Sequence, residues 1–409
     1  MIKRVVIENY RSCLRTSIDL HSNLSVLIGP NGSGKTNILQ AIMFLNKMAQ
    51  EDRYRPESDA ITVNPQIRVV FQQVQTQIQL NASVNAYTDQ SNNDVVLGSR
   101  QKWLFKGQRG KQSSFEIPLA LAARWSNQIT LFGLQHLQRS FRYRFKRTPP
   151  EISKSASRAL INVHGFCKGI RYYGASQFTN PGSCPVSFEI EQEGSRSRLF
   201  RLRGHARFLY DVYSARQAQS DNRFTEFMEI VGPKGLKLID DLTFRDVATS
   251  SIDYSVRVGG KVEIRRRHKL LVIPQFRIGR QRLSPNQLSE GTFKTLALLF
   301  HLIAADSTAL LIEEPEVCVH HGLLSSILEL VKTYSRRKLM ILSTHSDFVL
   351  DHVAPENVYR VTFDKSAGTV ARHIPKTMTA KELSGLREYL LQQGNLGEYW
   401  REGGLEDHP

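Results

Sequence analysis

The sequence predicts an α/β fold, a mixed sheet flanked by helices, with an α+β region inserted in the middle of the chain. In two blocks, residues 1–50 and 283–365, apolar strands alternate with helices. Strands that are apolar throughout imply a sheet covered on both faces. Between the blocks, residues 66–106 alternate polar and apolar side chains, which is typical of an antiparallel meander.

These patterns divide the chain into four predicted segments. They are an N-terminal lobe at 1–50, an inserted region at 51–282, a second lobe at 283–375 and a tail at 376–409. Within the insertion we expect helices over 118–165, a hairpin over 186–203, helices over 204–230 and strands over 236–279. The tail carries one predicted helix, over residues 380–394.

Composition narrows the class of protein. The chain has 409 residues, of which 41% are hydrophobic and 23% charged, and this balance predicts a folded core. No apolar stretch is long enough to cross a membrane, and the first residues lack the apolar core of a secretory signal. The four cysteines lie far apart and form no CxxC pair. We therefore expect no zinc site, no disulfide framework and a cytoplasmic location.

The net charge of +17 suggests a polyanionic partner, with nucleic acid the first candidate. The alternative is a generally basic surface with no such partner. Four basic clusters in the middle region are candidates for phosphate contact, and each is otherwise a solvated face. They are residues 139–147, residues 265–269, the run Arg196, Arg198, Arg201, Arg203 and Arg207, and the group Arg277, Arg280 and Arg282.

A glycine-rich loop at residues 29–36 (GPNGSGKT) is the strongest motif. It follows the apolar strand LSVLI and opens a helix, which is the context that a phosphate-binding loop requires. Glycines let backbone N–H groups surround phosphate oxygens, and the helix N-terminus adds positive potential. Lys35 is expected to reach the β- and γ-phosphates, and the Thr36 hydroxyl to ligate magnesium. ATP and Mg²⁺ are the expected ligands.

An acidic pair, Glu313 and Glu314, ends the apolar strand ALLIE. Successive side chains alternate along a strand, so the two carboxylates can take separate tasks. Glu313 would hold magnesium, and Glu314 would orient and deprotonate the attacking water. The alternative is a solvated acidic strand end.

Two weaker signals accompany these motifs. The segment LSEG at residues 288–291 precedes a long apolar helix, so Ser289 and Gly291 can bind a second phosphate at a helix N-terminus. The alternative is an ordinary helix cap at Ser289 or Ser284. His345 follows the strand LMIL and can contact the γ-phosphate or the attacking water, unless it is merely structural.

These four elements, in this order, resemble the ABC-type ATPase heads of the SMC and RecF class. They are most similar to stand-alone bacterial ATPases of the RecF/OLD group, some of which act in anti-phage defence. The opening IENYRS resembles the start of that group, and EEPE followed by His320 resembles a second family motif, although His321 replaces the usual proline. The resemblance covers residues 1–50 and 283–365.

The resemblance implies a P-loop NTPase head and a role for each matching residue. The implied catalytic residues are Glu314, His345 and Lys35, and the implied metal ligands are Thr36 and Glu313. The nucleotide would be bound by Arg11, Ser12, Gly29, Asn31, Gly32, Ser33, Gly34, Lys35, Thr36 and Asn37, with Gln177 as the Q-loop candidate. Ser289 and Gly291 would act across a dimer. The chain departs from the family in having Glu313 for the common Asp and LSEG for LSGGQ.

The preferred functional hypothesis is an ATPase that dimerises, or forms a higher oligomer, around ATP and controls an effector protein. The effector would be a nuclease or toxin encoded nearby, in a bacterial anti-phage defence system. No nuclease signature is found in this chain itself. One alternative is a RecF-like DNA repair ATPase. Another is an ATP-gated scaffold with little turnover, whose tail, with Trp400, docks a partner unless it packs on its own domain.

Overall fold

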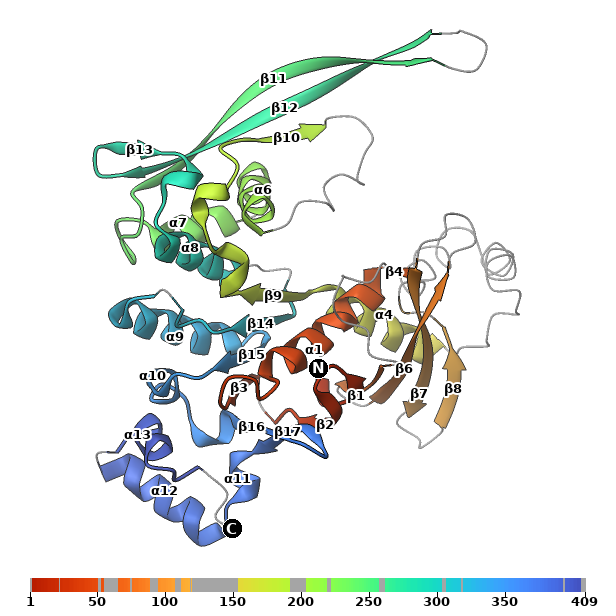
Figure 1. Ribbon diagram of the computed structural model, residues 1–409, viewed down its shortest axis with the longest axis vertical. Coiled ribbons are helices and arrows are strands. Elements are labelled where there is room, and N and C mark those ends of the chain that lie inside the picture. Colours follow the sequence, from red (N-terminus) through yellow and green to blue (C-terminus); the bar gives the residue numbers. More distant parts are fainter. Residues whose placement is uncertain are drawn as a thin grey trace. The chain divides into compact units, whose positions relative to one another are not determined.

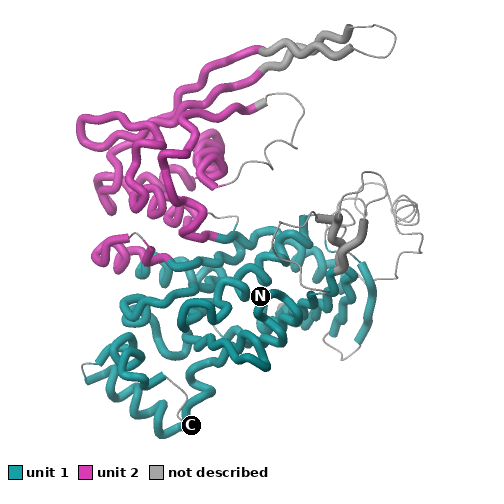
Figure 2. The backbone as a smooth tube through the Cα atoms, viewed as in Figure 1, with its two compact units in different colours: residues 1–172, 306–314, 328–409 teal, residues 173–305, 315–327 magenta. Residues whose placement is uncertain are grey.

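The structure is a computed structural model, and the part of the chain that it describes falls into two compact units (Figure 2). Unit 1 comprises residues 1–172, 306–314 and 328–409, and unit 2 comprises residues 173–305 and 315–327. The described residues are 2–21, 23–50, 53–54, 65–73, 76–88, 95–106, 112–117, 119, 154–191, 204–218, 222–256, 262–303, 307–317, 319–392 and 394–405. The predicted division into four segments stays a prediction.

The predicted mixed sheet is confirmed. Its strand order is β17-β16-β3-β15-β14-β9, and β16, β3, β15 and β14 pair in parallel while β17 is antiparallel to β16 (Figure 1). β3 and β15 are buried along their whole length and β14 is buried as far as Ile312, as expected of strands in a sheet that is covered on both faces. The strands are β3 (Leu24–Ile28), β9 (Ile170–Gly174), β14 (Ala309–Glu313), β15 (Leu339–Thr344), β16 (Val358–Asp364) and β17 (Gly368–His373).

A second sheet in unit 1 is the antiparallel meander that the alternation over 66–106 predicts. The strand order is β2-β1-β5-β6-β7-β4, with β8 paired to β7. Every pairing given for it is antiparallel. The strands are β1 (Ile2–Tyr10), β2 (Cys13–Asp19), β4 (Arg53–Tyr54), β5 (Gln66–Gln73), β6 (Thr76–Thr88), β7 (Val95–Lys106) and β8 (Gln112–Glu116).

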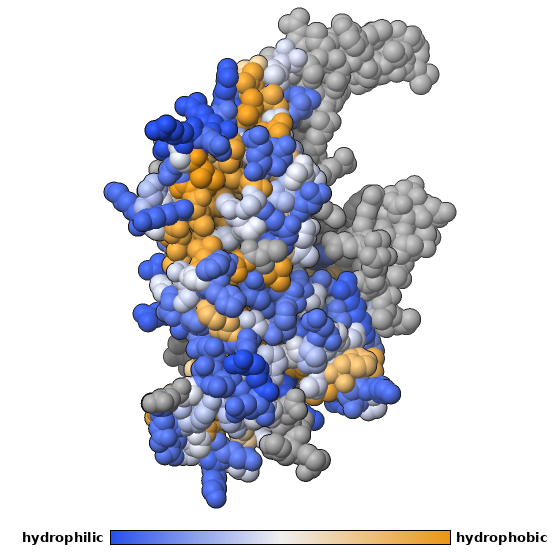
Figure 3. Space-filling model, turned by 60° about the vertical axis from the view of Figure 1, so that its left-hand side comes forward, coloured by the Kyte–Doolittle hydropathy of each residue, from blue (hydrophilic) through white to orange (hydrophobic). Residues whose placement is uncertain are grey.

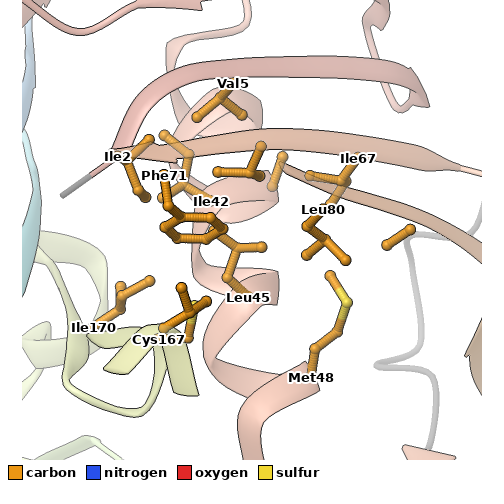
Figure 4. Close-up of a cluster of buried hydrophobic side chains, with 14 of the residues drawn as sticks. Ile2, Val5, Ile42, Leu45, Met48, Ile67, Phe71, Leu80, Cys167 and Ile170 are labelled. Carbon is orange, nitrogen blue, oxygen red and sulfur yellow. The ribbon is translucent and has the colours of Figure 1, made fainter. Parts of the chain in front are cut away.

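Helix α1 (Lys35–Gln50) forms the centre of the unit 1 core. Its apolar residues recur at helical spacing, and Ile42, Leu45 and Met48 pack against side chains of β1, β5 and β6 (Figure 4). Helix α4 (Lys154–Lys168) also packs against α1. Because α1 begins at Lys35, this core fixes the helix that carries the phosphate loop.

The C-terminal segment packs on unit 1. The N–H of Gly397 donates to Asp351 Oδ1 at 2.8 Å, and Arg401 Nε lies 3.1 Å from Asp347 Oδ2. This is the own-domain packing that the sequence left open as the alternative to partner docking. The remaining helices of this region are α10 (Asp347–Leu350), α11 (Ile374–Thr377), α12 (Ala380–Gln392) and α13 (Leu396–Arg401), and α9 (His321–Ser335) begins in unit 2 and ends in unit 1.

Unit 2 combines a long β-ribbon with helices around an aromatic core. The sheet order is β10-β12-β11, with β13 on β12, and Phe293 stacks with Phe178 and contacts Phe208. The predicted helices over 204–230 and strands over 236–279 are confirmed. The elements are β10 (Phe188–Glu191), α6 (Gly204–Gln217), α7 (Arg223–Val231), β11 (Asp241–Val256), β12 (Val262–Ile278), β13 (Gln281–Leu283) and α8 (Glu290–Ile303).

Two predicted elements fall partly outside the described residues. Of the helices expected over 118–165, the structure describes α4 and, before it, only Leu119. Of the hairpin expected over 186–203, it describes β10, which pairs with β12. Among the described helices, none is both long and apolar enough to span a membrane.

Asn46 of α1 ties the helix to the chain that enters the mixed sheet. Its Nδ2 lies 3.2, 2.8 and 3.2 Å from the carbonyl oxygens of Cys167, Lys168 and Ile170, and the side chain is only 3% exposed. Asn46→Ala is expected to lower the free energy of unfolding by about 1–3 kcal/mol, because buried carbonyls lose their donor. Urea unfolding of the full chain measures this change. The control is Gln112→Ala, which removes an exposed amide on β8. Its free energy of unfolding should stay within about 0.5 kcal/mol of wild type. Equal effects of the two substitutions would contradict the role assigned to Asn46.

Candidate nucleotide-binding site

Three neighbouring parallel strands end at one edge of the mixed sheet. The phosphate loop follows β3, Glu314 follows β14, and His345 follows β15, which lies between them. Because the carboxyl ends of parallel strands meet at one edge, motifs far apart in the sequence come together there. The topology therefore assembles the site that the sequence predicts.

Two positions of the phosphate loop must be glycine, because there is no space for a Cβ atom. Gly29 and Gly34 have φ angles of 152° and 99°. A Cβ on Gly34 would lie 1.9 Å from Thr369 Oγ1, and one on Gly29 would lie 2.1 Å from the Val361 carbonyl oxygen. Both obstacles belong to the β16–β17 hairpin, so the loop rests directly on that hairpin. Gly32, with φ of 79°, has nothing within 4 Å of such a Cβ and faces open space.

Lys35 lies at the start of α1 with its ammonium group turned back to the loop. Nζ donates to the carbonyl oxygens of Gly29 at 2.7 Å and Pro30 at 3.0 Å, and the residue is 6% exposed. An ammonium group has three donors and no acceptor, so it suits a phosphate oxygen at the same place. Ser33 is buried in the loop, whereas Asn31 is exposed.

Glu313 is held between two hydroxyl groups. The Thr36 hydroxyl donates to Glu313 Oε1, and the Tyr172 hydroxyl donates to Glu313 Oε2. Carboxylate and hydroxyl oxygens are the ligands that Mg²⁺ prefers, so the donor set fits the ion expected here. Burial, and then the hydrogen bond to Glu313, raise the pKa of Tyr172 well above its ordinary value, so it remains a neutral donor. No local sequence pattern marks Tyr172, so its contact with Glu313 could not be predicted from the sequence.

Glu314 has a backbone conformation that L-residues rarely adopt. Its φ is 47°, and its N–H donates to the Ser343 carbonyl at 2.9 Å, so the end of β15 holds it in place. Such a conformation costs about 1–3 kcal/mol and is common at active sites. The Glu314 Oε1 lies 3.4 Å from His345 Nδ1, and both side chains are partly exposed, at 34% and 45%. The geometry thus pairs the predicted base with the predicted histidine.

Arg11 and Ser12 join the loop through a polar network. The Arg11 guanidinium donates to Asn37 Oδ1 at 3.3 Å, and the Asn37 amide donates to Ser12 Oγ at 2.6 Å. Ser12 Oγ lies 2.7 Å from Thr369 Oγ1, which donates to the Ser33 carbonyl at 3.0 Å. Arg11 also has a positive φ, of 50°. Thr369 is fully buried, and no pattern in the sequence predicts its contact with the loop.

Three of the expected nucleotide residues lie in unit 2. Ser289 is exposed and caps α8, since its Oγ accepts the Thr292 N–H at 3.2 Å. Gly291 lies in the first turn of the same helix, where Glu290 pairs with the buried Lys294 at 2.6 Å. Gln177 is exposed in a short turn after β9. The contacts of these residues with nucleotide remain predictions.

The four basic clusters are only partly described. Residues 139–147, together with Arg196, Arg198, Arg201 and Arg203, lie outside the described residues, as do the side chains of residues 265–268. Arg207 pairs with Asp211 at 2.9 Å, as a solvated face would. Arg277, Arg280 and Arg282 are exposed near the β12–β13 turn.

Thr369→Val should weaken ATP binding. The valine keeps the shape of the side chain but removes the donor to Ser33 and the contact with Ser12, a loss of about 1 kcal/mol or roughly fivefold in Kd. Titration with a fluorescent ATP analogue measures the change. Thr362→Val, the same substitution on neighbouring β16, is the control and should bind as wild type does. Equal affinity in the two variants would show that the hairpin does not support the loop.

Tyr172→Phe should raise the Mg²⁺ concentration needed for ATP binding and turnover. Loss of a group that orients a metal ligand typically costs about 10–100-fold in metal affinity. The measurement is nucleotide-analogue fluorescence against Mg²⁺ concentration, with turnover as a second readout. The control is Tyr173→Phe, which removes a hydroxyl that donates to the Lys294 carbonyl in unit 2, at 3.2 Å. An unchanged Mg²⁺ dependence in Tyr172→Phe would refute this role.

Two family models and several curated relatives match parts of this chain. Residues 1–165 match the family described as "AAA ATPase domain", and residues 175–351 match "AAA domain, putative AbiEii toxin, Type IV TA system". The Rad50 double-strand break repair ATPase of Methanopyrus kandleri is 55% identical over 42 residues, 10% of this chain and 5% of that protein. The RecF replication and repair protein of Vibrio campbellii is 46% identical over 44 residues, 11% of this chain and 12% of that protein.

Solved SMC head domains align with most of the chain. The head from Thermotoga maritima is 13% identical, covers 91% of this chain and 98% of its own, and has a TM-score of 0.39. The head from Pyrococcus furiosus, bound to the C-terminal domain of ScpA, is 12% identical, covers 94% and 99%, and has a TM-score of 0.42. The matches to the curated relatives span only a small part of those proteins. The two family models and the Rad50 and RecF relatives, with the motifs in the order observed here, identify the chain as an SMC- and RecF-like ATPase of the ABC type.

Proposed function

We propose that this ATPase dimerises around ATP and uses the closed dimer to control a partner protein in bacterial defence. The observation that carries the proposal is the exposed Ser289 at the N-terminus of α8. The N–H groups at a helix start, with a hydroxyl beside them, form an anion site. Unit 1 already has a phosphate loop of its own, so this second anion site suits the ATP held by another copy.

Within one copy, each residue at the strand ends has a separate task. Lys35 and the loop amides bind the phosphates, while Thr36 and Glu313 would hold Mg²⁺. When bound, the ion neutralises charge on the phosphate oxygens. Glu314 accepts a proton from the attacking water, and His345, 3.4 Å away, orients that water and the Glu314 carboxylate. Loss of the γ-phosphate removes the group that Ser289 and Gly291 of a second copy would bind, and the dimer opens.

A protein partner is favoured by two observations. On the face seen in Figure 3, apolar residues gather over the surface of unit 2, and exposed apolar surface often marks an interaction site. The second family model is described as a putative AbiEii toxin of a Type IV TA system, which supports a link to a toxin–antitoxin system. ATP would then act as a switch, because it binds the closed state more tightly than the open one.

Glu314→Gln should trap the closed dimer. Loss of the general base should slow hydrolysis by about 10²–10⁴-fold while ATP binding persists. Light scattering during size-exclusion chromatography should then show a dimer with ATP and Mg²⁺ and a monomer without them. Lys35→Ala, which lacks the ammonium group that binds phosphate, should remain monomeric throughout. A monomeric Glu314→Gln protein at saturating ATP would contradict ATP-dependent dimerisation.

The defence role has a separate test. Expression of the wild-type protein with its genomic neighbours should reduce phage plating, and Lys35→Ala should abolish the reduction. As a control, the ATPase activity of the purified wild-type protein is measured. Unchanged plating by a protein with full ATPase activity would rule out the defence role and leave the ATP-driven dimer standing.

A further inference from the structure

Helix α10 begins two residues after His345 and is too short to be stable by itself. It consists of residues 347–350, and its turn is closed by a hydrogen bond at 3.0 Å from the Asp351 N–H to the Asp347 carbonyl. Isolated helices of this length do not persist in water, so tertiary contacts hold it. Its last two residues are fully buried and fix its inner side. A second set of contacts comes from residues 395–405, which we call the C-terminal segment.

The C-terminal segment is itself anchored to unit 1. Leu396 and Leu405, near its two ends, are only 2% and 4% exposed. On β16, the buried Arg360 guanidinium donates to the Leu405 carbonyl at 2.8 Å. At the start of α13, the Asn395 side chain accepts the Glu398 N–H at 2.7 Å and caps the helix. The segment therefore has a defined position from which it can support another element.

Gly397 of this segment lies directly against α10. Helices α10 and α13 contact each other, and the Gly397 N–H donates to Asp351 Oδ1 at 2.8 Å (Figure 1). A Cβ on Gly397 would lie 2.3 Å from the Asp347 carbonyl oxygen, which is the acceptor that closes the turn of α10. There is no space for a side chain between the two backbones, so α13 rests on α10 only because this residue is glycine.

Asp347 joins the two helices through its carboxylate. Its Oδ1 accepts the Phe348 N–H at 2.8 Å inside the first turn of α10, and its Oδ2 lies 3.1 Å from Arg401 Nε. Both partners of the ion pair are partly exposed, so the attraction between them is modest. Both carboxylate oxygens are nevertheless engaged, and the start of α10 is bound to α13 at a second point.

The chain between β15 and α10 carries His345. On one side, Thr344 of β15 is fully buried, and its hydroxyl accepts the Ser346 N–H at 2.9 Å. On the other side lies α10. The His345 side chain is 45% exposed, so its direction depends on this backbone more than on packing around the ring. Its Nδ1 lies 3.4 Å from Glu314 Oε1, a distance that changes if α10 moves.

We propose that the C-terminal segment positions His345 against Glu314 by holding α10 in place, and that ATP hydrolysis slows when the segment is displaced. Gly397 and Arg401 are positioning residues, which act through His345. The proposal rests on the role proposed above for that histidine. The phosphate loop has its own support from the β16–β17 hairpin, so ATP affinity should not depend on the contact between α13 and α10.

The test is Gly397→Ala in the full chain, with Gly385→Ala as the matched control. The added methyl group collides with α10 in the first variant, whereas a Cβ on Gly385 of α12 has nothing within 4 Å. In Gly397→Ala, kcat for ATP should fall by about 10–100-fold, because a small misplacement caused by a distant change can cost that much in rate. The Kd for a fluorescent ATP analogue should stay at its wild-type value. Gly385→Ala should match wild type in both measurements.

Two substitutions of Arg401 separate positioning from a loss of folding. Arg401→Gln removes an exposed ion pair without a collision, and it should lower kcat by up to about fivefold. Arg401→Lys keeps the positive charge and should restore kcat. If Gly397→Ala does not fold, this pair decides, and a wild-type kcat in Arg401→Gln would then overturn the proposal.

A double-mutant comparison shows whether the effect passes through His345. In a His345→Ala background, Gly397→Ala should change kcat by less than about twofold, because the group that it misplaces is already absent. The proposal is overturned if Gly397→Ala keeps the wild-type kcat, if kcat falls equally with and without His345, or if ATP affinity falls in parallel with kcat. Wild-type turnover in His345→Ala alone would remove the role of the histidine and the positioning with it. Slow turnover in His345→Ala together with fast turnover in Gly397→Ala would remove the positioning alone.

Discussion

The site depends on the close contact between the phosphate loop and the β16–β17 hairpin. Gly29 and Gly34 approach the hairpin so closely that any Cβ would collide with Val361 or Thr369. Thr369 also donates to the Ser33 carbonyl, across 336 residues of sequence. The loop therefore cannot take its shape from its own glycines alone. It needs a hairpin near the other end of the chain, which explains why the two terminal blocks form one sheet.

Given that sheet, the order of its strands accounts for the rest of the site. Since β15 lies between β3 and β14, the Ser343 carbonyl can hold the N–H of Glu314, and His345 reaches the carboxylate of the same residue. The positive φ of Glu314 costs energy that the buried strands on both sides offset. With an unstrained backbone at the end of β14, the Glu314 carboxylate would lie in a different place. The strain therefore supports a functional assignment over a merely solvated acidic end.

Local patterns predicted the loop, the apolar strands, the meander and the acidic pair, because each is a continuous run of sequence. Tyr172 and Thr369 were missed because their importance comes from contacts between distant segments. Tyr172 meets Glu313 across 141 residues, and Thr369 meets Ser12 across 357. The contact between the C-terminal segment and α10 could not be predicted for a related reason. Gly397 meets Asp351 across 46 residues, and a glycine in a polar tail carries no local mark of close packing. The close approach of two distant backbones is visible in the structure and not in the sequence.

The two ends of the C-terminal segment meet different parts of unit 1. Gly397 lies on α10, beside the residues proposed for hydrolysis, whereas Leu405 is bound by Arg360, the neighbour of the Val361 that contacts the loop. Displacement of the α10 end would slow hydrolysis and leave the phosphates bound. The dimerisation proposed above would follow ATP binding, so slower hydrolysis would prolong the closed dimer. A partner that captured the displaced segment would therefore extend the closed state through the rate of hydrolysis. It would shift the equilibrium between open and closed states only by the difference between its affinities for the two.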